Sequence, residues 1–295
     1  MARMTQTEAW TIQRLMDWTR QFFQRKNVPE PRLATELLLA HALSVRKIDL
    51  YTRFEQVVPD GPLAVFRDLV RRAAEGEPIA YLIGYREFFS LSIKVTPDVL
   101  IPRPETETLV SELIHVARQS GKDPATLRIL DLATGSGCIA IALATHLPGA
   151  TVIATDVSPA ALAVAAENAA THKVTIDFRA GPLYEPVADG PPFDFICSNP
   201  PYISAGELPT LPHDVRDFEP AVALVAGPSG LEVIEPLIAG APARLIPGGM
   251  VFIEIGYTQA DKVVPLAAGT TGLADVRTVK DSLGHQRVVV AKRTE

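Results

Sequence analysis

The feature that most constrains the fold of this chain is an alternation of strand-like apolar runs and helical patterns, which follows a helix expected over residues 106–118. Such an alternation is typical of a wound parallel sheet covered by helices. The last two runs lie too close together for a helical crossover, so the sheet is expected to end in an antiparallel pair. The sequence therefore predicts an α/β fold, with strands over residues 128–132, 151–155, 174–178, 193–198, 250–255, 276–280 and 286–291.

The N-terminal part has a different pattern. Residues 8–77 show helical apolar spacing punctuated by Pro29, Pro31, Pro59 and Pro62, which predicts a small helical domain over residues 1–85. Residues 91–95 alternate like a strand, residues 96–98 turn, and residues 99–101 return, which predicts a β-hairpin linker over residues 86–104. Residues 105–295 then form the sheet domain.

Composition limits the class of protein. With 295 residues, 47% of them apolar, the chain can build a sizeable core. No apolar run approaches the ~18 residues of a membrane span, and the polar N-terminus carries no hydrophobic signal segment, so we expect a soluble cytoplasmic protein without membrane contact. Cys138 and Cys197 are interpreted as small core residues, and the six histidines show no metal-ligand spacing, so no metal is expected.

Charge is unevenly distributed along the sequence. Residues 1–90 hold 13 Lys and Arg against 11 Asp and Glu, and residues 91–295 hold 15 against 23. Broad binding to a nucleic-acid backbone requires a basic surface. The acidic C-terminal part therefore argues against nucleic acid as a direct partner.

A glycine-rich turn is expected to bind a cofactor. Residues 129–140 read as strand, turn and helix, in which Gly135 and Gly137 allow close backbone approach to a ligand at the helix N-terminus. The pattern also fits a dinucleotide fingerprint, with Asp156 as the carboxylate that binds the ribose. Asp131 favours S-adenosylmethionine over NAD, because a carboxylate there would repel a pyrophosphate and attract the ammonium of a methionine moiety. A helix cap or a loop carboxylate is the alternative for each aspartate.

The tetrapeptide Asn199-Pro200-Pro201-Tyr202 follows the expected strand 193–198. Two prolines fix the backbone and remove two donors, which leaves carbonyls exposed. With the side-chain oxygen of Asn199, two acceptors can converge on one NH2 group, and the ring of Tyr202 can lie against its plane. The segment thus predicts a site for an amide or amino-purine nitrogen. An ordinary proline turn is the structural alternative.

Taken together, these motifs resemble the seven-stranded, Rossmann-like methyltransferases that depend on S-adenosylmethionine, and within them the peptide chain release factor glutamine methyltransferase family. The resemblance covers nearly the whole chain. Beyond the tetrapeptide it is carried by PIAYLIG at 78–84, VLIPRPETE at 99–107, EPA at 219–221, GPSGL at 227–231, EIG at 254–256 and DSLG at 281–284.

The resemblance implies methylation of the glutamine in the Gly-Gly-Gln motif of class I release factors. It also implies that the helical domain binds this protein partner and that the enzyme is a monomer. It implies that Asn199, Pro200 and Tyr202 are catalytic and that they bind substrate together with Pro201. The implied cofactor-binding residues are Asp131, Ala133, Thr134, Gly135, Ser136, Gly137, Asp156, Leu183 and Asn199.

Two positions depart from the family pattern. Ala133 stands where glycine is usual, so its methyl group is expected to tighten the pocket or to require a negative φ. The segment around Leu183, where the adenine contact is expected, carries little polarity.

Three rival functions remain open. One is a glutamine methyltransferase that acts on a ribosomal protein, and another methylates exocyclic amines of nucleic acid bases. A third is a cofactor-binding interaction module without catalysis. The segment Pro104-Glu105-Thr106-Glu107 favours the release-factor type over the ribosomal one.

Overall fold

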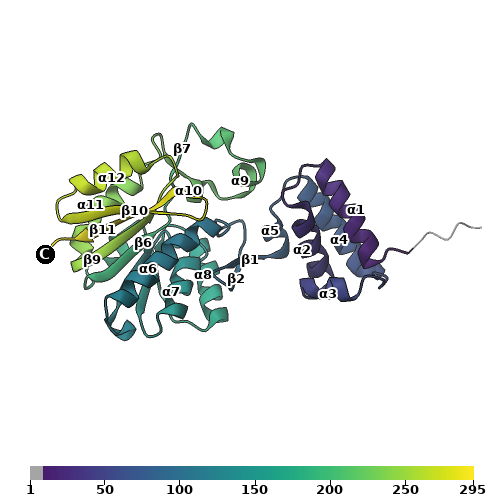
Figure 1. Ribbon diagram of the computed structural model, residues 1–295, viewed down its shortest axis with the longest axis horizontal. Helices are drawn as coiled ribbons and strands as arrows, with labels where there is room; N and C mark the ends of the chain where they lie inside the picture. The colour runs from purple at the N-terminus through teal and green to yellow at the C-terminus, as the bar shows by residue number, and fades with distance from the viewer. Residues whose placement is uncertain (1–8) are drawn as a thin grey trace, which may run out of the picture. The chain divides into compact units, whose positions relative to one another are not determined.

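The chain forms two compact units, which are described separately (Figure 1). The computed structural model describes residues 9–295. The helical unit holds the described residues up to Gly84 together with His213–Phe218, and the sheet unit holds Tyr85–Pro212 and Glu219–Glu295. The segment 213–218 thus belongs to the helical unit, although the sequence-based scheme places it in the third domain.

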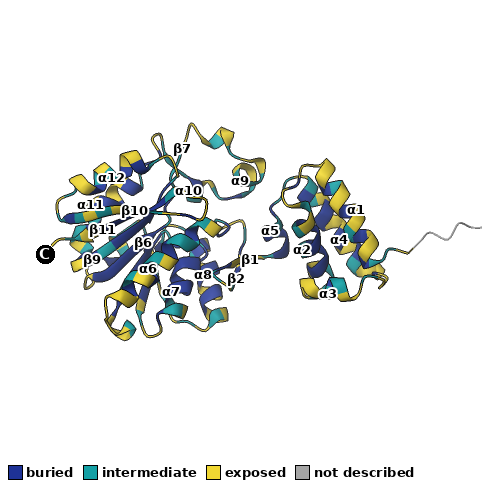
Figure 2. Ribbon diagram, viewed as in Figure 1, coloured by how far each residue is buried: buried dark blue, intermediate teal, exposed yellow. Residues whose placement is uncertain are grey.

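Short amphipathic helices build the helical unit around an apolar core. The Thr11 side chain caps the first helix by accepting a backbone N–H of its first turn, and Pro31 opens the second helix, where its missing donor costs nothing. Phe23, Leu38 and Phe66 are fully buried between the helices, whose inner faces are dark in Figure 2. The helices are α1 (Ile12–Arg25), α2 (Pro31–Leu43), α3 (Lys47–Thr52), α4 (Asp60–Ala74), α5 (Ile79–Ile83) and α9 (His213–Phe218).

The β-hairpin at the start of the sheet unit lies earlier than the sequence predicts. β1 (Tyr85–Phe88) pairs antiparallel with β2 (Leu91–Lys94). The connecting residues Phe89 and Ser90 have φ values of 50° and 62°. Two positive φ values are typical of a type I′ turn, whose twist matches that of the paired strands.

The predicted return strand over residues 99–101 is therefore wrong. That segment is irregular, because the prolines on either side of it supply no backbone donors. The N–H of Ile101 donates instead to the Glu219 carboxylate at 3.1 Å. The segment reaches the wall of the cavity described below rather than forming a sheet edge.

A seven-stranded mixed sheet forms the centre of the sheet unit, as the α/β prediction requires. Its strand order is β10-β11-β9-β6-β3-β4-β5. The predicted antiparallel end is confirmed, since β11 pairs antiparallel with both β9 and β10, while β3, β4, β5, β6 and β9 run parallel. The strands are β3 (Arg128–Leu132), β4 (Thr151–Asp156), β5 (Asp177–Ala180), β6 (Phe193–Ser198), β9 (Leu245–Glu254), β10 (Leu273–Lys280) and β11 (Gln286–Arg293).

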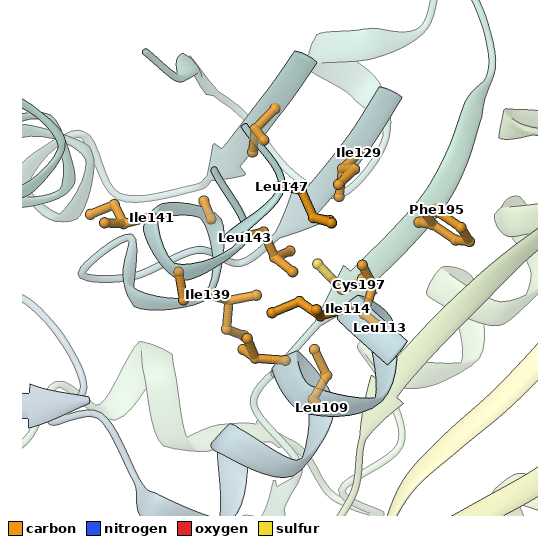
Figure 3. Packing of buried hydrophobic residues seen from close by; sticks show 14 of the residues in the cluster. Leu109, Leu113, Ile114, Ile129, Ile139, Ile141, Leu143, Leu147, Phe195 and Cys197 are labelled. Atoms are coloured by element: carbon orange, nitrogen blue, oxygen red, sulfur yellow. The ribbon is translucent and has the colours of Figure 1, made fainter. Parts of the chain in front are cut away.

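Two apolar cores cover the two faces of this sheet, because successive strand residues point to opposite sides. Ile129 belongs to the core that β3 shares with α6 and α7, as the close view in Figure 3 shows, and with Ala169 of α8. Leu130 belongs to the core formed with α11 and α12. Figure 1 shows the same two helical layers. The helices are α6 (Glu107–Gln119), α7 (Cys138–His146), α8 (Pro159–His172), α10 (Ala221–Leu224), α11 (Ile234–Arg244) and α12 (Ala260–Gly269); a minor parallel pair is β7 (Ile203–Ser204) with β8 (Val225–Gly227).

Several strand boundaries differ from prediction: β10, for example, begins at Leu273 rather than at residue 276. The third strand begins at Asp177 rather than at residue 174, because Lys173 ends α8 in the left-handed region and the Val174 N–H still bonds the Ala169 carbonyl at 3.1 Å. β9 begins at Leu245 rather than at residue 250. It includes Gly248 and Gly249, which do not indicate a strand in the sequence. Cys138 and Cys197 are free and buried, as predicted. Among residues 9–295, no helix is both long and apolar enough to cross a membrane.

Candidate active site

A cavity of about 340 Å³ lies at the carboxyl ends of β3, β4 and β6 in the sheet unit. This edge of an open α/β sheet is where ligands bind, and the volume lies within the range of small-molecule sites. The wall combines the glycine-rich turn, the ends of the strands and segments far away in sequence. It is formed by residues 98–100, 102, 103, 106, 133–136, 138, 139, 156–158, 161, 181–183, 199, 201, 222, 223, 225, 232 and 233.

Gly135 leaves the cavity open at the tip of the turn. Its φ is +54°, and no described heavy atom lies within 4 Å of the position that a Cβ would take. Its N–H donates to Asp156 Oδ2 at 2.8 Å, which fixes the turn to the end of β4. A ligand can therefore approach the backbone closely at this point.

Ala133 has a φ of +56°, so of the two expected consequences of its methyl group, a tighter pocket or a negative φ, the second is wrong. The turn leaves β3 in the left-handed conformation that glycine would adopt freely, and alanine keeps it at a steric cost. Ala133 also lines the cavity, together with Thr134 and Ser136.

Gly137 lies outside the cavity wall and has a packing role. It is the N-cap of α7 with a φ of +79°. A Cβ there would stand 3.0 Å from Ala165 Cβ and 3.2 Å from Ile141 Cδ1. The residue thus permits α7 to pack closely against α8.

Asp131 is also outside the wall, fully buried below the turn. Thr134 Oγ1 donates to Asp131 Oδ2 at 2.6 Å, and the Cys197 thiol lies 3.8 Å from Oδ1. Burial raises the pKa of Asp131 to about 7, against the opposing effect of the Thr134 hydrogen bond. In this structure Asp131 holds the turn through Thr134, and it does not face the cavity.

Asp156 lies at the end of β4 and faces the cavity. Each of its oxygens accepts one backbone N–H: Oδ2 from Gly135 at 2.8 Å and Oδ1 from Ser158 at 2.9 Å. A carboxylate has about four acceptor positions, so capacity remains on both oxygens. The geometry suits two neighbouring hydroxyl groups such as those of a ribose.

The cavity wall also contains apolar residues, which suit an apolar ring. Leu183 lines the cavity with a φ of +42°, and its carbonyl accepts the Thr155 hydroxyl at 3.3 Å. Val157 and Ile139 add apolar surface nearby. An open backbone at Gly135, a carboxylate and an apolar wall fit the nucleoside part of the cofactor that the sequence implies. Among residues 9–295, no group of three or more His, Cys, Asp or Glu side chains could hold a metal ion.

Two residues of the tetrapeptide line the same cavity. Asn199 and Pro201 are part of the wall, while Pro200 is buried and Tyr202 packs against the core next to α11 and α12. Asn199 Nδ2 donates to Thr106 Oγ1 at 3.1 Å, which leaves Oδ1 as the acceptor for a ligand. Burial raises the pKa of Tyr202 to about 12, so the phenol is neutral at physiological pH.

Sequence reasoning missed two side chains that support this loop. Thr106 is fully buried and holds Asn199; it lies in the segment PETE, which the resemblance quotes without giving it a role. Gln259 binds the loop from α12: its Nε2 donates to the carbonyls of Tyr202 at 2.9 Å and Gly230 at 3.2 Å, and its Oε1 accepts the Gly256 N–H at 2.9 Å. No sequence pattern identifies Gln259.

An ion pair between Arg103 and Glu219 supports the cavity wall. Arg103 Nη2 lies 2.5 Å from Glu219 Oε1, and the Glu219 side chain is only 1% exposed. Because Arg103 also lines the cavity, this pair fixes the segment 98–103 as part of its wall. The motifs at 99–107 and 219–221 are thus joined in space.

Two family models match the chain. The model "PrmC N-terminal domain" matches residues 14–84, and "Methyltransferase small domain" matches residues 106–211. A release factor glutamine methyltransferase from Rhodopirellula baltica is 42% identical over 98% of each chain. Another from Geobacter sulfurreducens is 42% identical over 96% of each.

Solved structures share the fold at lower identity. The catalytic domain of hMettl16, in complex with the MAT2A 3′UTR hairpin 6, superposes with a TM-score of 0.54 at 20% identity, covering 77% of this chain and 81% of that one. At this identity the likeness shows the fold alone.

Proposed function

Because the chain belongs to the release factor glutamine methyltransferase family, we propose that Asn199 and Pro200 hold the glutamine amide that this S-adenosylmethionine-dependent enzyme methylates. The observation that carries the proposal is the placement of Asn199 in one cavity with the glycine-rich turn and Asp156. We further propose that the glutamine is the one in the Gly-Gly-Gln motif of class I release factors.

The cofactor would be held by the turn and by Asp156. The proposed contacts are the backbone of residues 133–136, the two free acceptor positions of Asp156 for the ribose hydroxyls, and Leu183 for the adenine ring. When bound, S-adenosylmethionine supplies a methyl group on a positively charged sulfur. The proposed contribution of Asp131 is indirect, through the Thr134 hydroxyl that it fixes.

Asn199 and Pro200 would orient the substrate nitrogen. An amide nitrogen is a weak nucleophile because its lone pair is delocalised into the carbonyl. Asn199 Oδ1, left free by the Thr106 contact, and the Pro200 carbonyl would each accept one amide hydrogen. Such positioning can lower a barrier by several kcal/mol, up to ~7–11 in ideal cases. The two oxygens would also favour positive charge that develops on the nitrogen, and Tyr202 would pack against the amide plane.

The helical unit would recognise the release factor. The division of roles follows the two compact units and the two family models, one on each unit. A release factor as substrate would place the enzyme in the cytoplasm with the translation machinery, and we expect it to act as a monomer.

The test is a methylation assay with labelled S-adenosylmethionine. Purified protein is incubated separately with class I release factor, ribosomal protein and nucleic acid, and the product is mapped by mass spectrometry. We expect label on the Gly-Gly-Gln glutamine, and we expect N199A to abolish it. Thr145→Val, on the exposed side of α7, is the control and should retain full activity. Label on another substrate alone would overturn the proposal.

A further inference from the structure

The helical unit contains a groove between α1 and α4, which shares no residue with the wall of the candidate active site (Figure 1). Its volume of about 430 Å³ lies within the range of pockets that bind ligands. Both tryptophans of the chain, Trp10 and Trp18, line this α1–α4 groove. Tryptophan is enriched among the residues that contribute most to binding at protein interfaces. The groove therefore has the composition of a protein-binding surface.

Aromatic rings from the start of the chain form one continuous apolar surface in the groove. The ring of Trp18 stacks on that of Phe22, with centroids 5.1 Å apart and an angle of 11° between the planes. Trp10 meets Trp18 edge-on, with centroids 6.3 Å apart. These contacts hold the indole of Trp18 in place, yet 46% of the residue stays exposed. A partner that covers the rings would remove apolar surface from water, which is favourable.

The two sides of the groove show helical spacing. They are formed by Leu15, Trp18, Thr19 and Phe22 on α1, and by Phe66, Val70 and Ala74 on α4. A third helix can place its own apolar stripe between two such rows, as amphipathic helices do in hydrophobic grooves. An extended peptide would instead add to the free edge of a sheet, and the described part of the helical unit contains no strand. The groove therefore fits a helix.

Positive charges border the apolar surface. Lys26 at the end of α1 and Arg67 on α4 line the groove, and neither has an ion-pair partner among residues 9–295. Arg71 also lines it but is neutralised by Asp68 at 2.7 Å and by Glu75 at 2.9 Å. The unpaired charges of the groove are thus both positive. Because charges at the rim of an interface favour partners of opposite charge, the groove selects for carboxylates beside the apolar stripe of its partner.

We propose that the α1–α4 groove binds an amphipathic helix of the release factor, with apolar side chains on the tryptophan surface and Asp or Glu side chains near Lys26 and Arg67. The inference rests on the proposed function, in which the helical unit recognises the release factor. It adds to that function the binding surface and the chemistry of the bound segment. Since the groove lies outside the active-site wall, its residues contribute to KM for the protein substrate and not to the methyl transfer step.

The first experiment reverses the unpaired charges one at a time in the full-length enzyme. For K26E and for R67E we expect KM for the release factor to rise roughly fivefold, with kcat and Kd for S-adenosylmethionine unchanged. Added salt should raise the KM of the wild type more than that of either variant, because the variants lack one attractive charge. R25E is the matched control, since Arg25 is the exposed neighbour of Lys26 on α1 and lies outside the groove. An unchanged KM in K26E and R67E, or an equal increase in R25E, would overturn the inference.

The second experiment tests the aromatic surface with W18S, for which we expect KM for the release factor to rise about tenfold or more. I48S is the control, because Ile48 on α3 is 60% exposed and lies outside the groove. Thermal unfolding of both variants checks the fold, and if W18S fails to fold, the charge variants still decide. An equal KM in W18S and I48S, both folded, would overturn the role of the tryptophan surface.

A short peptide that contains Gly-Gly-Gln separates the groove from the active site. The peptide lacks the proposed helix, so the wild type, K26E and R67E should methylate it at equal rates. A lower rate in the two variants would place their defect in the active site and overturn the inference. Absence of methylation of the release factor by the wild type would instead refute the proposed function, so the two failures are distinguishable.

Photo-crosslinking identifies the occupant of the groove. The full-length enzyme carries p-benzoylphenylalanine at position 18 and is irradiated with the release factor, and the crosslinked peptides are mapped by mass spectrometry. We expect crosslinks to an amphipathic helix of the release factor that carries Asp or Glu beside its apolar side. Crosslinks to an extended loop, or between two copies of the enzyme, would overturn the choice of occupant.

Discussion

At the scale of single residues, Ala133 holds a conformation that its side chain disfavours. Its φ of +56° places the Cβ close to the following carbonyl, at a cost of about 1 kcal/mol. We expect A133G to raise the free energy of unfolding by up to about 1 kcal/mol, reduced by the greater freedom of glycine in the unfolded chain. Thermal and urea unfolding measure the change. A lower midpoint for A133G would show that the methyl contact stabilises more than the backbone strain costs.

Substitution of Gly135 can distinguish the effect of backbone strain from the effect of lost ligand contact. In G135A the new methyl group would stand in open cavity space on a φ of +54°, so we expect weaker S-adenosylmethionine binding by at least about tenfold, as well as lower stability. Gly121 has a similar φ of +68° and equally open surroundings away from the cavity, so G121A is the matched control. Calorimetric titration should show a binding defect in G135A alone. Equal affinities for both variants would contradict the assignment of the turn to the cofactor.

At the scale of elements, the loop after β6 depends on one amide from another helix. Gln259, the N-cap residue of α12, satisfies three backbone groups from three segments. Q259A leaves them without these bonds, so we expect kcat/KM to fall about tenfold or more and the unfolding midpoint to decrease. Q259E keeps the acceptor for Gly256 and loses both donated bonds, so it should not restore activity. Methyl transfer assays at saturating cofactor decide the point, and recovery in Q259E would contradict the donor role.

The hairpin shows why local patterns fail at this scale. The sequence favours a return strand at residues 99–101 on alternation alone, whereas the structure turns at Phe89-Ser90 and leaves residues 99–101 irregular. Neither Phe nor Ser is among the residue types that indicate a turn with positive φ values. The contact that holds residue 101, the Glu219 carboxylate, lies 118 positions away and is invisible to any local pattern.

At the scale of the whole molecule, buried carboxylic acids link stability to pH. Burial raises the pKa of Asp131 from 3.8 to about 7. Between these values the Asp131 carboxyl group binds more protons in the folded chain than in the unfolded chain. Its contribution to stability is therefore fully present below about pH 4 and is lost as the pH rises to about 7, by about 1.4 kcal/mol for each unit of difference in pKa. D131N has no such loss. We expect its stability relative to wild type to increase from pH 5 to pH 8.

Urea unfolding of both proteins at the two pH values measures this difference. All other titrating groups are shared, so the change in the difference isolates Asp131. A constant difference between wild type and D131N would mean that the carboxyl group is ionised in the folded protein at pH 5.

The α/β class, the antiparallel end of the sheet and the glycine-rich turn could be predicted from the amino-acid sequence, as could the placement of Asn199 and Asp156 at the carboxyl ends of neighbouring strands. These features depend on short-range periodicity and on chemistry within a few residues, which a chain carries in its order of side chains. Three features become visible only in three dimensions: Asp131 and Gly137 support the turn from outside the cavity, Ala133 adopts a positive φ, and Thr106 and Gln259 hydrogen-bond to the tetrapeptide. The hydrogen bonds from Asn199 to Thr106 and from Gln259 to Tyr202 join residues 93 and 57 positions apart, so they arise only when the sheet brings its strand ends together.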